Sequence, residues 1–421
     1  MSSNDKEILV FADWQGLNGP LLMGRLFASR LRGKEVFQFE YEPEWLKKES
    51  VLHIDPELAY YTGRQFPSSG RNIFGVFLDS MPDRWGRQLM LRREALMARK
   101  EGREARQLFE SDYLLGVYDL QRQGGLRFKL VGDDRFLNDD KALAVPPMSL
   151  LRDLEHASME IENSDDLDDN IASKWLNMLM APGSSLGGAR PKAGVKDKEG
   201  HLWIAKFPGK NDDTDVGAWE MIASELGRQS GLNMATSKVI RLSSKHHTYL
   251  SRRFDRTSSG NRLHFASAMT LLQYNDGDDF TSGASYLELA DFIIRHGAQP
   301  EKDLEELWRR IVFFVCIKNT DDHLRNHGFI LHNDGWRLSP AYDVNPNPKG
   351  TGLRLNISEN DNALDLELAR SISPFFRVTP AKANEIIHRV NETVASWQAI
   401  ANRYQVSKFD HNMMMPAFCI S

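Results

Sequence analysis

The polar stretch Asn319–Asn326, with Asp343 a short way downstream, constrains this chain more than any other feature. Transfer of a phosphoryl group to a hydroxyl needs one carboxylate that orients the nucleophile. It also needs a second carboxylate and an amide oxygen that hold Mg²⁺ against the nucleotide phosphates. Asp321, Asp343 and Asn326 supply these three groups. The pattern therefore predicts the catalytic end of a kinase, provided that the fold brings the side chains together.

The segment between these residues predicts a β-hairpin. Phe329–Leu331 and Trp336–Leu338 are short apolar-rich runs on either side of Asp334-Gly335. That dipeptide favours a two-residue type I′ turn. We therefore expect Asn333 to pair with Trp336.

The same register, continued along the ladder, places Asn326 opposite Asp343. Two oxygen ligands would then lie across neighbouring strands within reach of one ion. The alternative is a surface loop rich in Asp and Asn before an ordinary hairpin.

Two upstream segments have the character of phosphate contacts. In Ser184–Lys192, the small residues Gly187 and Gly188 allow backbone N–H groups to approach phosphate oxygens closely. Leu202–Pro208 alternates as a strand does and carries Lys206, suitably placed to reach the α and β phosphates. A plain glycine turn and a solvated lysine on an edge strand are the alternatives.

An amphipathic helix is predicted next, with Asp215 as its N-cap and Gly231 as its stop signal. Glu220 lies off the apolar stripe, so it either points at Lys206 or faces water. Two strand-like runs and a connector follow: Lys238–Leu242, Thr248–Leu250 and Ser251–Arg256. In a two-lobed kinase the connector at this point in the order holds the adenine.

Taken in order, these segments resemble the HipA-like serine/threonine kinases, the toxin components of bacterial toxin–antitoxin modules. The resemblance covers most of the chain. It rests on six motifs: Phe77–Arg87, Ser185–Lys192, Ala205–Pro208, Arg253–Arg256, Asp321–Asn326 and Pro340–Asp343. One departure is Arg190-Pro191, where many members carry Gln or Glu. Since proline lacks an N–H and fixes φ, this loop is stiffer.

The resemblance implies a role for each matching residue. Asp321 is the catalytic base, Asn326 and Asp343 bind Mg²⁺, and Glu220 supports the site. Ser185 is the residue that autophosphorylates, with Ser184 as a neighbouring candidate; a phosphate there adds roughly two negative charges beside the nucleotide and favours ejection of the loop. The implied ATP contacts are Gly187, Gly188, Ala189, Arg190, Lys192, Lys206, Arg252, Arg253, Phe254, Asp321, His323 and Asp343. The residues themselves suggest that His323 braces the catalytic loop, since the chain after His327 continues as a strand and disfavours a zinc or iron site.

The expected fold class is α+β, a two-lobed protein-kinase-like fold with a mixed α/β N-terminal lobe and an all-α C-terminal lobe. We expect an N-terminal α/β subdomain at 1–135, a kinase N-lobe at 136–258 and a helical C-lobe with the metal-binding hairpin at 259–421. Further elements predicted from periodicity are strands at Ile8–Phe11 and Val36–Phe39 and helices at Arg84–Lys100, Tyr286–His296, Lys302–Lys318 and Pro380–Arg403.

Composition places outer bounds on function. The chain has 421 residues and a formal net charge of -5, so there is no general attraction to nucleic acid or anionic membrane. Cys316 and Cys419 are its two cysteines, which suits a reducing compartment. The polar start and the lack of a run of about 20 apolar residues lead us to expect a cytoplasmic protein.

Three functions from different classes remain open. The leading one is an ATP- and Mg²⁺-dependent kinase acting on serine or threonine of a cellular protein, for which the resemblance suggests an aminoacyl-tRNA synthetase or another translation component. The second is a small-molecule kinase on the same scaffold. The third is a co-repressor that binds a HipB-like DNA-binding antitoxin encoded nearby and contacts DNA only through it, with phosphorylation secondary.

Overall fold

The computed structural model describes residues 5–48, 53–68, 70–163, 169–179, 188 and 190–418. The chain divides into two compact units. Unit 1 comprises Met1–Lys210 and Asp255–Ala266, and unit 2 comprises Asn211–Phe254 and Ser267–Ser421. The predicted domain boundaries after residues 135 and 258, and the arrangement in two lobes, stay predictions.

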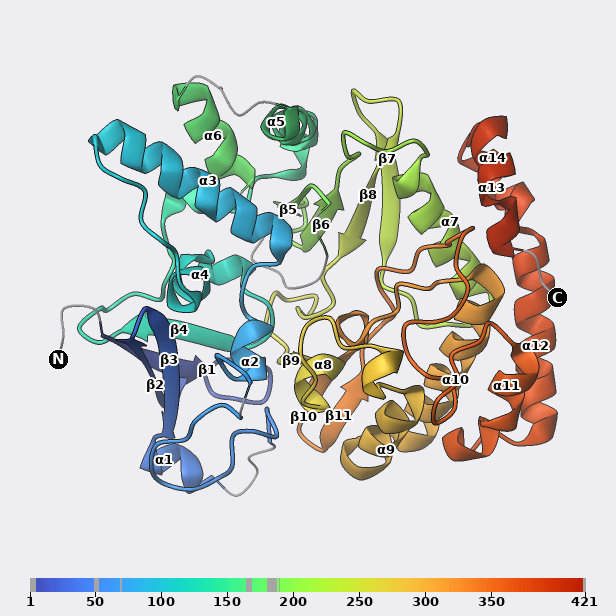
Figure 1. Ribbon diagram of the computed structural model, residues 1–421, viewed down its shortest axis with the longest axis horizontal. Helices are drawn as coiled ribbons and strands as arrows, with labels where there is room; N and C mark the ends of the chain where they lie inside the picture. Colours follow the sequence, from blue (N-terminus) through green and yellow to red (C-terminus); the bar gives the residue numbers. More distant parts are fainter. Residues whose placement is uncertain are drawn as a thin grey trace. The chain divides into compact units, whose positions relative to one another are not determined.

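Unit 1 is built on an antiparallel four-stranded sheet in the order β3-β2-β1-β4 (Figure 1). Its side chains alternate as a half-buried sheet requires, with Ile8 and Val10 of β1 and Phe37 and Phe39 of β3 fully buried. The rings of Phe39 and Phe77 lie 5.7 Å apart, so the segment before the first long helix closes this core. The strands are β1 (Lys6–Ala12), β2 (Leu21–Leu31), β3 (Lys34–Tyr41) and β4 (Leu126–Leu130).

The helix predicted over Arg84–Lys100 is confirmed as α3, the longest helix in the described part of unit 1, and Asp83 caps it by accepting a hydrogen bond from the Gly86 N–H. A two-stranded hairpin, β5–β6, completes the unit and pairs Lys192 with Lys206. The bounds are α1 (Pro43–Leu46), α2 (Gly75–Leu78), α3 (Arg84–Glu101), α4 (Glu110–Gly116), α5 (Leu151–Asn163), α6 (Asp169–Leu179), β5 (Lys192–Lys196) and β6 (Leu202–Lys206). Short 3-10 turns are η1 (Asp119–Gln121), η2 (Lys141–Leu143) and η3 (Met148–Leu150).

The segment Asp255–Ala266 belongs to unit 1 although the chain around it belongs to unit 2. Asp255 accepts a hydrogen bond from the Gly124 N–H at 2.9 Å. Arg256 donates to the Arg122 carbonyl at 2.8 Å, and Arg262 donates to the Asp119 carbonyl at 2.7 Å. These bonds satisfy backbone groups of the buried turn before β4.

Unit 2 combines helices with two strand pairs, β7–β8 and β10–β11. Its elements are α7 (Val216–Gln229), β7 (Ser237–Arg241), β8 (His247–Arg252), α8 (Ala268–Leu271), η4 (Phe280–Ser282), α9 (Tyr286–His296), α10 (Pro300–Ile317), η5 (Leu324–Asn326), β10 (Gly328–His332), β11 (Gly335–Leu338), α11 (Leu366–Ser371), η6 (Ser373–Phe376), α12 (Pro380–Ala395), α13 (Trp397–Arg403), α14 (Lys408–Met414) and η7 (Met415–Phe418). Strand β9 (Phe265–Ser267) crosses the boundary between the units. The expectation of an all-α C-terminal part is not met, because apolar residues of β10 and β11 form a buried strand pair there.

Helix α10 is the centre of unit 2. Leu304, Leu307, Ile311, Phe314 and Val315, predicted as core from their spacing, are all buried. The end of the chain packs on α7: the rings of Trp397 and Phe418 stack at 4.7 Å, and Trp219 lies 5.9 Å from each.

The predicted helix over 380–403 is two helices. It breaks at Ser396, whose hydroxyl donates to the Thr393 carbonyl at 2.7 Å and so competes with the helical bonding pattern. None of the helices in the described part of the chain has the length and apolar character needed to cross a membrane.

The β10–β11 hairpin exists, but its predicted register is wrong by two residues. Trp336 pairs with Leu331, not with Asn333, and the turn is centred on Asn333-Asp334. Gly335 serves a different purpose: a Cβ there would lie 2.7 Å from the His296 carbonyl oxygen and 3.0 Å from the Ala298 nitrogen. The glycine therefore allows β11 to pass close to the α9–α10 connection, where the Ala298 N–H donates to the Trp336 carbonyl.

As a consequence, the strand ladder does not place Asn326 opposite Asp343. The paired strands end at Phe329 and Leu338, and the predicted meeting of the two ligands across the ladder is wrong. The two segments are joined by side-chain bonds instead.

Candidate functional site

The loop that carries Asp321 begins where α10 ends. Lys318 has φ +49° and closes the helix in the left-handed conformation, with the Asn319 N–H bonded to the Phe314 carbonyl at 2.9 Å. Because α10 is fixed in the core, the loop starts from a rigid point.

The two neighbouring aspartates of this loop have opposite environments. Asp321 is exposed. Asp322 is buried and accepts hydrogen bonds from the Tyr286 hydroxyl and, at 2.8 Å, from the Arg354 N–H. Burial raises the pKa of Asp322 to about 6, against the opposing effect of these bonds. Asp322 therefore holds the loop in place, and Asp321 is the exposed carboxylate of the pair.

The segment that carries Asp343 is tied to this loop at several points. The Tyr342 hydroxyl donates to the Arg325 carbonyl at 2.7 Å, which joins the residues directly before Asp343 and Asn326. Further along, the Asn345 N–H bonds to the Asn319 side-chain oxygen at 3.0 Å. The two segments thus form one cluster within unit 2, although not through the predicted strand ladder.

The oxygen atoms of this cluster suit a hard divalent cation. The Asn326 amide nitrogen donates to the Asp321 carbonyl at 2.7 Å, which leaves its side-chain oxygen as the atom for an ion. Asp343 is half-buried and has φ +54°, a left-handed conformation that most non-glycine residues seldom adopt and that Asp adopts more often than most. Carboxylate and amide oxygens are the protein ligands that Mg²⁺ prefers, together with water and phosphate oxygens.

The predicted connector follows β8. The Arg252 N–H bonds to the Thr236 carbonyl at 2.8 Å, Arg253 is buried, and the Phe254 ring lies 5.3 Å from that of Tyr342. The connector is therefore packed beside the segment that carries Asp343.

Glu220 is buried in α7 of unit 2, so it does not face water. Lys206 is buried in β6 of unit 1. Their pairing stays a prediction. His323 is partly buried, and its role as a brace or an ATP contact also stays a prediction.

Lys192 is fixed by a buried clamp in unit 1. Its ammonium lies 2.5 Å from the Asp83 carboxylate and 2.8 Å from the Gly188 carbonyl oxygen. The Trp85 indole N–H also donates to the Lys192 carbonyl at 3.0 Å. Because the pair is almost fully buried, Lys192 anchors the end of the predicted phosphate loop to the N-terminus of α3.

The structure describes only part of the rest of that loop. Gly188 and the half-buried Arg190 are described, whereas Ser184, Ser185, Gly187 and Ala189 lie outside the described residues.

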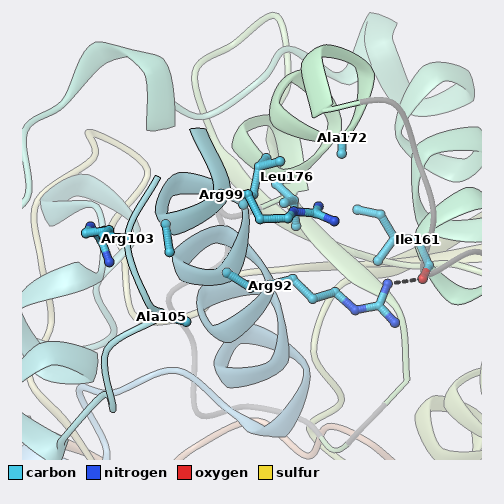
Figure 2. Close-up of a pocket in the computed structure, with 10 residues that line it drawn as sticks. Arg92, Arg99, Arg103, Ala105, Ile161, Ala172 and Leu176 are labelled. Atoms are coloured by element: carbon cyan, nitrogen blue, oxygen red, sulfur yellow. Dashed lines mark hydrogen bonds between the residues drawn. The ribbon is translucent and has the colours of Figure 1, made fainter. Parts of the chain in front are cut away.

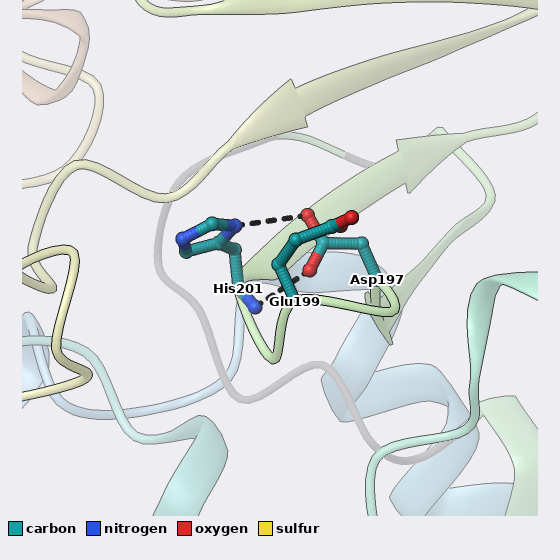
Figure 3. Close-up of side chains that lie close together, drawn as sticks. All are labelled: Asp197, Glu199 and His201. Atoms are coloured by element: carbon teal, nitrogen blue, oxygen red, sulfur yellow. Dashed lines mark hydrogen bonds and ion pairs between the residues drawn. The ribbon is translucent and has the colours of Figure 1, made fainter.

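A second group of ligand-type side chains lies in the β5–β6 turn: Asp197, Glu199 and His201 (Figure 3). Asp197 accepts hydrogen bonds from the Trp203 indole at 2.8 Å and from the His201 backbone at 2.7 Å and ring at 3.1 Å. Partial burial opposes ionisation, but these bonds outweigh it and lower the pKa of Asp197 to about 2. The carboxylate braces the turn.

A pocket of about 400 Å³ lies between α3, α5 and α6 in unit 1 (Figure 2). It contains none of the predicted site residues. Its lining residues are Arg92, Ala95, Leu96, Ala98, Arg99, Arg103, Ala105, Ile161, Ala172 and Leu176.

Sequence reasoning missed the partners that fix the predicted residues. Asp83 is 109 positions from Lys192, so no local pattern joins them. Asn345 follows Asp343 by two residues in a chain of turn-forming residues, and only its contacts distinguish it.

Comparison with protein families gives one match over half of the chain. The family model described as the HipA-like C-terminal domain matches residues 184–397. This range includes the Lys206 strand, the connector, the Asp321 loop and Asp343.

One curated protein is similar in sequence over part of its length. A Haemophilus influenzae protein described as "Putative kinase" is 27% identical over 191 residues, which are 40% of this chain and 54% of that protein. The chain thus matches about half the length of this curated relative.

Among solved structures, the HipA toxin of Shewanella oneidensis, in a complex with HipB and operator DNA, is similar with a TM-score of 0.63. The similarity covers 98% of this chain and 96% of that one at 16% identity, and it shows a common fold. The Helicobacter pylori kinase CtkA matches 50% of this chain at a TM-score of 0.32, too low to support an inference.

Proposed function

This chain belongs to the family of the HipA-like C-terminal domain, and from that premise we propose that it is an ATP- and Mg²⁺-dependent protein kinase specific for serine or threonine. One observation carries the proposal. Asp321 is exposed, while its neighbour Asp322 is buried and bonded, so the loop presents one available carboxylate beside the Asp343 segment.

In the proposed mechanism, Asp321 orients the acceptor hydroxyl and takes its proton as the oxygen attacks the γ-phosphorus. The bond between the γ-phosphorus and the β–γ bridging oxygen breaks at the same time, and ADP is the leaving group. Asn326 and Asp343 would hold Mg²⁺ through side-chain oxygens, and the ion, when bound, would supply neutralisation of charge on the phosphates. Lys206, the Gly187–Lys192 loop and the connector Arg252–Phe254 orient the nucleotide, and His323 and Glu220 support these groups.

We further propose that the chain phosphorylates its own loop at Ser185, or at Ser184, and thereby inactivates itself. The acceptor in the cell is a protein, such as an aminoacyl-tRNA synthetase or another translation component. This part of the proposal rests on the family alone.

The test is intact-mass measurement of the full chain after incubation with Mg²⁺ and ATP, with peptide mapping around residues 184–185. Asp321→Asn removes the proposed base, so we expect one added phosphate in the wild type and none in this variant. The matched control is Asp334→Asn, because Asp334 is an exposed aspartate in the β10–β11 turn outside the cluster. It should match the wild type. Phosphate on Asp321→Asn at the wild-type rate would contradict the assignment of the base.

We also propose that the chain acts as the toxin of a toxin–antitoxin module and binds a HipB-like DNA-binding antitoxin encoded nearby. The similar Shewanella oneidensis structure is such a complex, which supports the proposal. Co-expression with the neighbouring gene should yield a complex that shifts operator DNA, whereas the chain alone should not. Separate elution of the two proteins would contradict it.

A further inference from the structure

Asp322, the buried aspartate of the Asp321 loop, is held by two donors from separate segments of unit 2. The Tyr286 hydroxyl, at the first position of α9, donates to Oδ2 of Asp322. The Arg354 N–H donates to Oδ1 at 2.8 Å. Each carboxylate oxygen thus has its own donor. Because the Arg354 donor belongs to the backbone, the Tyr286 hydroxyl is the one of the two that a side-chain substitution removes.

Tyr286 is itself fixed from several directions. It is fully buried, and its ring lies edge-on to that of His327, with the centroids 5.5 Å apart and an angle of 86° between the planes. Its backbone N–H donates to the Asn356 carbonyl at 3.0 Å, and a capping box closes the start of α9. The hydroxyl therefore reaches Asp322 from a rigid part of the core.

The Tyr286 hydroxyl acts as a donor to a charged acceptor. Burial and the negative charge of Asp322 raise the pKa of Tyr286 well above its ordinary value, so the hydroxyl keeps its proton. At neutral pH, above its own pKa of about 6, Asp322 is ionised. A hydrogen bond to an ionised group is stronger than one between neutral groups. Loss of the hydroxyl would leave a buried carboxylate oxygen without that donor.

We propose that Tyr286 is a positioning residue for Asp321 and acts through Asp322. One rigid peptide bond joins the two aspartates, so a bond that fixes the Asp322 carboxylate also restricts the backbone from which Asp321 extends. A general base must lie within hydrogen-bond reach of its proton, and a displacement of about 1 Å can cost about a hundredfold in rate. This inference rests on the proposed function, in which Asp321 is the base. The motifs that carry the family resemblance do not include Tyr286.

The experiment follows phosphate gain by the full chain with intact-mass measurement at several concentrations of MgATP. It gives a maximal rate and a half-saturating ATP concentration. Tyr286→Phe keeps the ring and removes the hydroxyl, and we expect its maximal rate to fall about tenfold to a hundredfold. The half-saturating ATP concentration should stay within about twofold of the wild-type value, because the change affects the transition state and not nucleotide binding.

The matched control is Tyr404→Phe. The Tyr404 hydroxyl also donates to a carboxylate in unit 2, that of Glu225 at 2.9 Å, but Glu225 lies on α7 and not in the Asp321 loop. This variant should gain phosphate at the wild-type rate. A second measurement does not depend on catalysis: hydrogen exchange of the backbone amides at 319–326 should be faster in Tyr286→Phe and unchanged in Tyr404→Phe.

A second variant tests whether Tyr286 acts through Asp322. Asp322→Ala removes the acceptor of the hydroxyl, so it should also slow phosphate gain. Adding Tyr286→Phe to Asp322→Ala should slow it no further, because both substitutions break the same bond. Fully additive effects of the two substitutions would show that Tyr286 acts by another route, and they would overturn the inference.

The remaining outcomes separate this inference from the proposed function. If the wild type and Asp321→Asn both gain no phosphate, the proposed function fails, and this inference fails with it. If the wild type gains phosphate while Tyr286→Phe and Tyr404→Phe do so at the same rate, the proposed function stands and the role of Tyr286 is wrong. A rise in the half-saturating ATP concentration that accounts for the whole loss would also overturn it, because Tyr286 would then support nucleotide binding.

Discussion

At the scale of single residues, burial decides which ionisable groups hold structure and which are available for chemistry. Asp321 and Asp322 are identical in sequence terms, and only the contacts of Asp322 with Tyr286 and Arg354 distinguish them. The resemblance selected Asp321, and its role as the base stays a prediction. His264 extends the same argument to a group outside the site: it is fully buried against Trp14, with ring centroids 4.8 Å apart.

Replacing His264 by phenylalanine should change how stability depends on pH. Burial lowers the pKa of His264 to about 3, whereas the unfolded chain has the ordinary value near 6.5. As the pH falls, the unfolded state therefore gains a proton before the folded state does. The free energy of unfolding of the wild type then falls by up to about 1.4 kcal/mol per pH unit between about pH 6 and pH 4. His264→Phe keeps the ring stacking, but its stability should not fall in this way. The measurement is urea unfolding at pH 7, 6 and 5.

An exposed histidine provides the comparison. His388 has a side chain that is 73% exposed, so His388→Phe is the control for the His-to-Phe substitution itself, measured at the same three pH values. Parallel pH profiles for wild type and His264→Phe would contradict the prediction.

At the scale of elements, capping residues and hydrophobic periodicity in the sequence correctly predicted helix ends and buried helix faces. The N-cap at Asp215, the helix Tyr286–His296 and the apolar face of α10 are confirmed, because capping and periodicity act within a few residues. The hairpin register was missed because Gly335 is placed by its neighbours at His296–Ala298, a tertiary contact that overrides the turn preference of Asp-Gly. The clamp between α3 and β5 was missed for the same reason.

Breaking that clamp should destabilise unit 1 strongly. Lys192→Met leaves Asp83 as a buried charge without its ammonium partner, which costs roughly 3–5 kcal/mol. The double variant Asp83→Asn, Lys192→Met should lose less stability than Lys192→Met alone, because it leaves no unpaired charge in the buried site. Asn at position 83 can still cap α3. Chemical unfolding of the three proteins tests this.

The control lies on the same strand. Lys196 is exposed at the end of β5, and Lys196→Met should change stability by less than about 0.5 kcal/mol. Equal losses for Lys192→Met and Lys196→Met would show that the buried pair contributes nothing specific.

At the scale of the whole molecule, the order of the motifs along the chain was enough to identify the family. Each motif alone is a weak signal, but their joint order is specific. Sequence alone did not predict the division into units. The segment Asp255–Ala266 belongs to unit 1, although the residues on both sides of it belong to unit 2, and its hydrogen bonds are to Asp119, Arg122 and Gly124. Such long-range pairing of single polar groups has no periodic signature.

If the chain binds nucleotide, MgATP should stabilise it as a whole. A ligand at a hundredfold excess over its Kd adds about 2.7 kcal/mol to the native state, so the melting temperature should rise measurably. Asp343→Asn should keep a shift with ATP alone and lose the additional shift that Mg²⁺ produces. Equal shifts for wild type and variant with MgATP would contradict Asp343 as a metal ligand.

The return of Asp255–Ala266 to unit 1 has a consequence for synthesis on the ribosome. Residues 1–210 emerge first, yet the groups that bond the turn at 119–124 are translated only after Asn211–Phe254, which belongs to the other unit. Domains generally fold as units in order from the N-terminus. Here the first unit completes its hydrogen bonds only when the nascent chain has passed Ala266, so stalled chains shorter than this should depend on chaperones.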